Sequence, residues 1–250
     1  RRPGAGLCMR LAFRFARREL RSGVAGFRIF LACLALGVAA IAASGSTAEA
    51  FRQGLASQAR EILGGDVVFS LDQGRFSPDQ RAAFAAMGPV AYSVRANGMA
   101  ETGTGQRRLV DMRGVDAAYP LVGAVELSGA PDLATALRVE NGLAGAVVEQ
   151  GLLDRLNLKL GDTFTVGGAR FVARAVLLAE PDRLGRGFAL GPRVVTTVPA
   201  VEQAGLLAPG GLFDEAVRIA LPAGVDPKTA ITSVEKRFPQ SRLEARDRSE

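Results

Sequence analysis

The sequence contains no histidine and no tryptophan, and it has only two cysteines and two tyrosines. Without histidine, Ser-His-Asp and Cys-His catalysis and imidazole-based zinc sites are excluded. Cys8 lies in an arginine-rich segment and Cys33 in an apolar run, so the pair has no metal-ligand spacing and is expected on different sides of a membrane boundary. We therefore expect no disulfide, no metal site and no cofactor on this chain.

Signatures of nucleotide binding and of nucleophile elbows are also missing. The sequence has no G-x-x-x-x-G-K-[ST], no G-x-G-x-x-G and no G-x-S-x-G. The nearest candidate for a phosphate loop, Thr102 to Arg108, lacks the lysine and the following helix, and it predicts a hairpin turn. Acidic groups such as Glu101/Asp111/Asp116 and Glu180/Asp182 are interpreted as solvated faces or local ion pairs. The sequence predicts no catalytic residues.

The positive charge of the chain is confined to its beginning. Residues 1–28 hold eight arginines and one acidic residue, Glu19. The formal net charge of the whole chain is +6, so the rest of the chain is close to neutral. Aromatic residues are not interleaved with arginines after Arg28, as a base-stacking surface would require. Nucleic acid is therefore not an expected partner.

An uncharged apolar run follows the arginines. Residues 29–48 contain no charge, and twenty helical residues would extend about 30 Å, the thickness of a bilayer core. Because positively charged flanks stay in the cytoplasm, residues 1–28 are expected on the cytoplasmic side. We predict a transmembrane helix over 29–48, with residues after about 50 exported across the membrane.

A cleavable signal peptide is an alternative, with Ala48-Glu49-Ala50 as the cleavage site. The long basic leader and the length of the apolar run argue against it. Helical spacing also continues through Phe51, Leu55 and Ile62, and it stops at Gly64-Gly65. We favour one helix that crosses the membrane and continues as a helical stalk over 49–63.

The small residues of the run bear on whether this helix has neighbours. Ala35, Ala39 and Ala43 follow each other at intervals of four, the spacing that lets helices approach closely in a membrane. This pattern favours a multi-helix bundle over a lone anchor. An alanine-rich composition explains it equally well, so both interpretations stay open.

The segment before the span, Met9 to Gly26, has an apolar stripe and a basic face. Basic amphipathic helices of this kind lie in the membrane interface and bind anionic lipid headgroups. A plain positively charged flank is the alternative, and Met9 is a candidate for the natural start, which leaves residues 1–8 open. The residues expected to contact lipid are Arg14, Arg17, Arg18 and Arg21.

The exported part predicts a mixed α+β fold with short strands. Ser77-Pro78 and Asp226-Pro227 are helix starts with a capping residue followed by proline, and Gly167-Gly168 is a tight turn between strands. Expected strands are 67–71, 90–100, 107–115 and 216–221, together with one strand before and two after a helix within 145–183. Other expected helices are 77–87, 133–138 and 226–238.

Five blocks of the sequence together resemble a known family. They read FARRELRSG, ILGGDVV, RGVDAAYPLVGAVEL, LLDRLNLKLGDTFTVGGARFVARAVLLAEPDR and GFALGPRVVTTVPAVEQAGLL. In this order they are similar to the N-terminal part of FtsX/MacB-type ABC transporter permeases, and of their YbbP-like branch in particular. The resemblance covers nearly the whole chain.

The resemblance implies a protein of the bacterial inner membrane with a cytoplasmic N-terminus and with residues after about 50 in the periplasm. It implies a transmembrane helix followed by a MacB-like periplasmic core domain over 49–250, with further helices beyond the end of this sequence. It implies a separate cytosolic ABC ATPase that binds ATP and Mg²⁺, and a possible second permease copy or periplasmic partner. Coupling of ATP hydrolysis to periplasmic motion would serve export or extraction of lipophilic compounds, lipids or lipoproteins. A secreted or singly anchored binding or scaffold module, without an ATPase, is the alternative.

Overall fold

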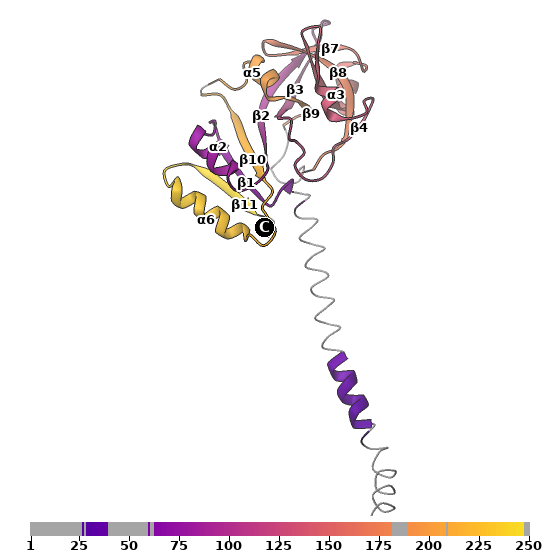
Figure 1. The fold of residues 1–250 in the computed structure, drawn as a ribbon. Helices are drawn as coiled ribbons and strands as arrows, with labels where there is room; N and C mark the ends of the chain where they lie inside the picture. The colour runs from indigo at the N-terminus through magenta and orange to yellow at the C-terminus, as the bar shows by residue number, and fades with distance from the viewer. Residues whose placement is uncertain are drawn as a thin grey trace, which may run out of the picture. The chain divides into compact units, whose positions relative to one another are not determined.

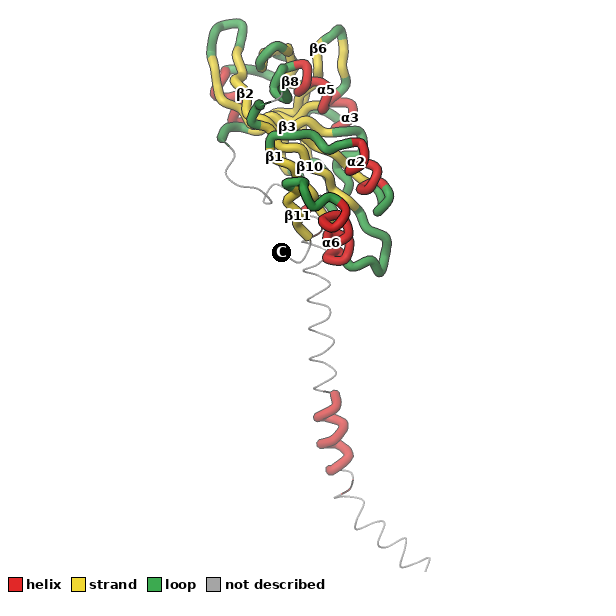
Figure 2. Tube along the Cα trace, turned by 90° about the vertical axis from the view of Figure 1, so that its left-hand side faces the viewer, coloured by secondary structure: helices red, strands yellow, loops and turns green. Residues whose placement is uncertain are grey.

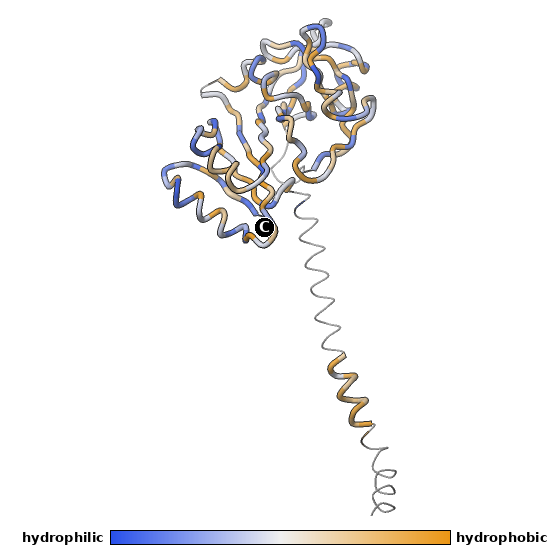
Figure 3. The backbone as a smooth tube through the Cα atoms, viewed as in Figure 1, coloured by the Kyte–Doolittle hydropathy of each residue, from blue (hydrophilic) through white to orange (hydrophobic). Residues whose placement is uncertain are grey.

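The chain divides into two compact units, Arg1–Leu55 and Ala56–Glu250. The computed structural model describes residues 27, 29–39, 60, 63–181, 190–208 and 210–247. In the first unit, residues 29–39 are helical and exposed, and this helix is the orange one of Figure 3. No helix among the described residues is long and apolar enough to cross a membrane. The span over 29–48 and the stalk over 49–63 extend into residues outside the described part, so both stay predictions.

The second unit is an α+β domain, as the sequence predicts (Figure 1). Its described helices are α2 (Pro78–Ala85), α3 (Leu133–Leu137), α4 (Gln150–Leu156), α5 (Val198–Gln203) and α6 (Pro227–Arg237). Its described strands are β1 (Val67–Asp72), β2 (Val90–Glu101), β3 (Arg107–Val115), β4 (Glu126–Ser128), β5 (Val139–Glu140), β6 (Leu143–Glu149), β7 (Thr163–Val166), β8 (Ala169–Ala179), β9 (Arg193–Thr197), β10 (Phe213–Ile219) and β11 (Leu243–Asp247).

The chain's first and last strands build one lobe, which we call the four-strand lobe. Its strand order is β11-β1-β10-β2, and every neighbouring pair is antiparallel. In sequence it reads β1-α2-β2 and then β10-α6-β11, the split β-α-β arrangement. Helices α2 and α6 lie on the same side of the strands (Figures 1 and 2). They cover a core in which the Phe69 and Phe84 rings stack with centroids 5.1 Å apart.

Local capping explains where these two helices begin. The hydroxyl of Ser77 accepts from the backbone N–H of Gln80, whose side chain accepts from the Ser77 N–H in return. Asp226 accepts from both the backbone N–H and the hydroxyl of Thr229 at the start of α6. Proline follows each cap, at the first helical position, where its missing N–H costs nothing.

The cap of α6 gives a pH prediction. The hydrogen bonds from the Thr229 hydroxyl and backbone N–H hold the pKa of Asp226 below its usual value. The charged cap therefore stabilises the fold fully above about pH 4, and this contribution disappears as the pH falls through the lowered pKa. We expect Asp226→Asn, which caps without titrating, to flatten the acid limb of stability measured by urea denaturation between pH 5 and 2. Equal pH dependence in both proteins would contradict this role.

The segment between β2 and β10 forms a second lobe, the barrel lobe. Its strands pair in the cycle β2-β3-β9-β6-β8-β7-β2, in which β3/β9 and β6/β8 are parallel. Strand β7 closes the cycle because it pairs with β8 along its whole length and with β2 at two positions, Val166 to Ala100 and Thr165 to Glu101. Strand β2 belongs to both lobes: its first half pairs with β10 and its second half with β3.

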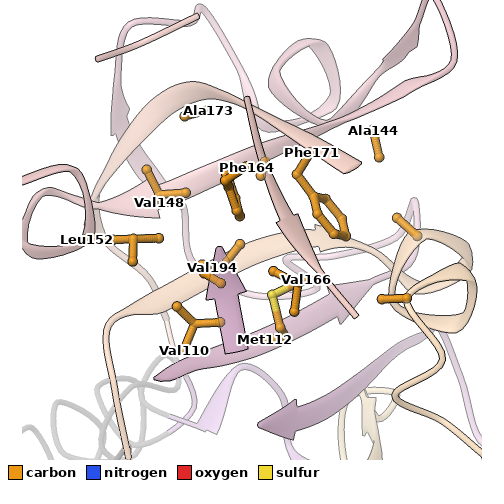
Figure 4. Close-up of a cluster of buried hydrophobic side chains, with 14 of the residues drawn as sticks. Val110, Met112, Ala144, Val148, Leu152, Phe164, Val166, Phe171, Ala173 and Val194 are labelled. Carbon is orange, nitrogen blue, oxygen red and sulfur yellow. The ribbon is translucent and has the colours of Figure 1, made fainter. Parts of the chain in front are cut away.

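The interior of the barrel lobe is packed with apolar side chains (Figure 4). The rings of Phe164 on β7 and Phe171 on β8 stack with centroids 5.7 Å apart, and both side chains are fully buried. Gly167 makes the turn between these strands with a φ of +56°. A Cβ at this position would lie 2.0 Å from the carbonyl oxygen of Ala204, so the turn also needs glycine for space.

Most expected elements are confirmed, and some strands were missed. The residues 102–106 form the predicted hairpin turn between β2 and β3. The strand expected at 216–221 is β10, which begins three residues and ends two residues earlier. The sequence reasoning did not identify α5 or the strands β4, β5, β9 and β11, although β9 occupies a central position in the sheet. The missed strands are two to five residues long, and β9 lacks the alternation by which half-buried strands are recognised.

Candidate functional site

The described residues contain no candidate metal centre. No group of three or more potential metal ligands occurs in the part of the chain that the structure describes. The predicted lipid contacts at Arg14, Arg17, Arg18 and Arg21 lie outside that part. Ala35 and Ala39 are exposed on the helix of residues 29–39, and Ala43 lies beyond the described residues, so the packing prediction is untested.

Charged side chains are instead gathered inside the second unit, in what we call the ionic network. Asp111 on β3 receives Arg95 Nε at 2.8 Å, and Arg193 Nη2 lies 3.0 Å from its second carboxylate oxygen. The Arg193 guanidinium also contacts Glu180, which follows β8. Arg113 pairs with the other oxygen of Glu180 at 3.2 Å. Five charges on β2, β3, β9 and the end of β8 are thereby linked in one chain.

The network is buried, which corrects the interpretation of these acids as solvated faces or local ion pairs. The Asp111 side chain is fully inaccessible, and the side chains of Glu180 and Arg113 are 2% and 6% exposed. The pairs of Glu180 come from residues 67 and 13 positions away, so its contacts depend on the tertiary fold. Glu101 does form the expected exposed pair, with Arg107 at 3.0 Å. Asp116 accepts from backbone N–H groups, and Asp182 lies outside the described residues.

An aromatic ring connects the network to the four-strand lobe. Tyr119 is buried, and the Arg113 guanidinium lies 4.8 Å from its ring centroid. The guanidinium of Arg218 on β10 lies 5.9 Å from the same ring and donates to Ser93 Oγ at 2.8 Å. Cation–π contacts of desolvated arginines are worth about 2 kcal/mol. Tyr119 therefore ties β3 of the barrel lobe to β10 of the four-strand lobe.

The second unit also contains an apolar groove of about 630 Å³. It lies where α3, the end of β3 and the start of α5 meet. Its buried lining residues are Val115, Tyr119 and Leu137, whereas Val139 is 59% exposed. The other lining residues are Asp116, Ala117, Leu133, Ala134, Arg138, Thr197, Val198 and Pro199. We call this hollow the α3 groove.

The close approach of α3 to β6 shapes the groove wall. Asp132 caps α3 by accepting from the Thr135 N–H at 2.7 Å. The helix then passes over Gly145 of β6, where a Cβ would lie 2.0 Å from the Ala136 carbonyl oxygen. Gly145 also donates to the Arg138 carbonyl at 3.2 Å. Only glycine at this position lets the helix lie so close to the strand, and sequence reasoning had no signal for that contact.

Comparisons with known proteins give a consistent family assignment. The model of the MacB-like periplasmic core domain matches residues 29–237. The chain is 29% identical over 179 residues to YbbP of Escherichia coli strain K12, described as an uncharacterized ABC transporter permease. This match covers 71% of the chain and 21% of YbbP, so the chain spans about a fifth of the length of that relative.

Two solved structures are similar to this chain at low sequence identity. The periplasmic region of MacB from Actinobacillus actinomycetemcomitans is 13% identical with a TM-score of 0.48, covering 76% of this chain and 92% of that one. The extracellular domain of the noncanonic ABC-type transporter YknZ from Gram-positive bacteria is 10% identical with a TM-score of 0.49, covering 73% and 100%.

Proposed function

The chain belongs to the family of MacB-like periplasmic core domains, and from this premise we propose that it is part of the permease subunit of an ABC transporter. Its second unit lies in the periplasm, and residues 29–48 cross the inner membrane from a cytoplasmic N-terminus. A separate cytosolic ATPase binds ATP and Mg²⁺ and drives its motion. The motion serves export or extraction of lipophilic compounds, lipids or lipoproteins.

The observation that carries this proposal is that the two lobes are built as one body. Ala56–Glu250 is a single compact unit, and β2 runs through both lobes. The ionic network and the contacts of Tyr119 add cross-links between neighbouring strands. A domain that transmits a displacement should be rigid, because a hinge between its lobes would absorb the movement.

The residues of the domain support the assignment of ATP hydrolysis to a separate ATPase. The sequence contains no phosphate-binding loop, and the described residues hold no metal-ligand group. Another buried carboxylate, that of Glu215, is also used for structure: it pairs with Arg75 and Arg81 and accepts from the Phe76 N–H. These buried acids are engaged in structural ion pairs, and we assign ATP hydrolysis to a separate subunit.

The proposal predicts the behaviour of the complete reading frame. With a C-terminal tag, the product should fractionate with the membrane, retain its N-terminal segment and co-purify with a P-loop ATPase, as identified by mass spectrometry. As a control, residues 56–250 expressed alone, which form the second compact unit, should be found in the soluble fraction and should not co-purify with the ATPase. A soluble product of the complete frame that begins near Phe51 would overturn the proposal and favour a secreted binding or scaffold module.

A further inference from the structure

We propose that the α3 groove binds a single-chain anionic amphiphile, with its alkyl chain along the apolar lining and its carboxylate or phosphate head at Arg138. The inference names a ligand class for the lipophilic cargo and rests on the proposed function for the ligand's role as cargo. The binding itself is argued from the groove alone.

The lining favours an alkyl chain. The groove's volume of about 630 Å³ falls within the range of 300–1,000 Å³ that is usual for small-molecule sites. Eight of its lining residues are Val, Leu, Ala or Pro, and three of these eight, Val115, Leu137 and Leu133, belong to or pack on the apolar cluster beneath. Aliphatic walls of this kind gain about 0.8 kcal/mol per buried CH₂ group of a ligand.

The charges of the lining favour an anionic head. Asp116 is already used by the protein: one carboxylate oxygen accepts from Tyr92 N–H at 2.7 Å and the other from Ala118 N–H at 3.1 Å. Arg138 is exposed, and its guanidinium takes part in none of the ion pairs within 4.0 Å among the described residues. After the hydrogen bonds from Thr135, its positive charge helps to lower the pKa of Asp132 at the start of α3. Its backbone is fixed by hydrogen bonds to Thr135 and Gly145. A cation on a fixed backbone at an apolar groove is complementary to a carboxylate or phosphate.

Photolabelling tests the inference on the full chain in lipid nanodiscs. The probe is palmitic acid with a diazirine in its alkyl chain, and labelled peptides are identified by mass spectrometry. We expect saturable labelling of peptides that contain residues 133–139 and 197–199, with competition by palmitate and by hexadecyl phosphate. Hexadecyltrimethylammonium should compete about tenfold less well, because its head is repelled by Arg138.

Variants at exposed positions separate the two parts of the argument. Val139→Asp places a charge in the apolar lining and should reduce labelling of the groove about tenfold. Arg138→Glu should reverse the preference between palmitate and hexadecyltrimethylammonium. Leu212→Asp is the matched control: Leu212 is 76% exposed, lies away from the groove lining and should leave the labelling unchanged.

Two outcomes would overturn the inference: labelling of the groove that does not saturate, or labelling that Val139→Asp leaves unaltered. Equal competition by the anionic and cationic amphiphiles would overturn the assignment of the head to Arg138. These failures are distinct from failure of the proposed function, which is measured by co-purification of the ATPase. A chain that recruits the ATPase but does not label in the groove would keep its function and lose this ligand site.

Discussion

Asp111→Ala is expected to lower the free energy of unfolding by about 3–5 kcal/mol, the cost of leaving buried charge without its partner. The Asp111 side chain is fully buried and holds two guanidinium groups, those of Arg95 and Arg193. Arg193 would keep its pair with Glu180, but Arg95 would lose its pair with Asp111 at a position where only 27% of the Arg95 side chain is exposed. Urea denaturation followed by far-UV circular dichroism measures the change, since the chain has no tryptophan.

Glu101→Ala supplies the matched control, because it removes the same kind of pair at the surface. Glu101 and Arg107 are 3.0 Å apart, and their side chains are 40% and 65% exposed. Solvent screens such a pair, so this variant should lose less than about 1 kcal/mol. If both variants lost the same small amount, the ionic network would have no special role in holding the strands of the barrel lobe together.

The sequence predicts the domain's elements better than it predicts their arrangement. Helix starts at Ser77-Pro78 and Asp226-Pro227 are local chemistry, and the structure confirms both. The turn at Gly167-Gly168 is likewise local. The pairing of β3 with β9 joins residues about eighty positions apart, and it depends on the packing of the whole lobe. No short-range pattern carries that information.

The site shows the same division. Asp111 and Glu180 are recognisable in the sequence as acidic residues. Whether they are solvated or form buried ion pairs depends on which arginines the fold places beside them. No motif in the sequence distinguishes Arg95 or Arg193, and only the sheet places both beside Asp111. The α3 groove was not predicted, because it requires α3 to lie close over Gly145. The charge pairs and the shape of the groove both depend on how the strands and α3 are arranged. They could therefore not be predicted from the sequence before the fold was known.

The second large effect is expected in the barrel lobe, where Phe171→Ala should cost about 3–5 kcal/mol. Phe171 is fully buried and stacks on Phe164, and its truncation would leave a cavity beside Phe164 in the apolar interior of the barrel lobe (Figure 4). Leu178→Ala is the control on the same strand: its side chain is 57% exposed, and the change should stay within about 0.5 kcal/mol. Urea denaturation of the three proteins gives the comparison.

The cavity should act most strongly on β7, because this strand has few other contacts to hold it. It is four residues long, and its pairing with β2 rests on two residue pairs. Without Phe171, Phe164 loses the ring that anchors β7 on the inside of the lobe, and the closure of the strand cycle weakens. Amide hydrogen exchange should therefore accelerate in β7 before it does in β1 or β10. If amide hydrogen exchange accelerated equally in both lobes, the domain would unfold only as a whole. Strand β7 would then close the barrel without being its least stable strand.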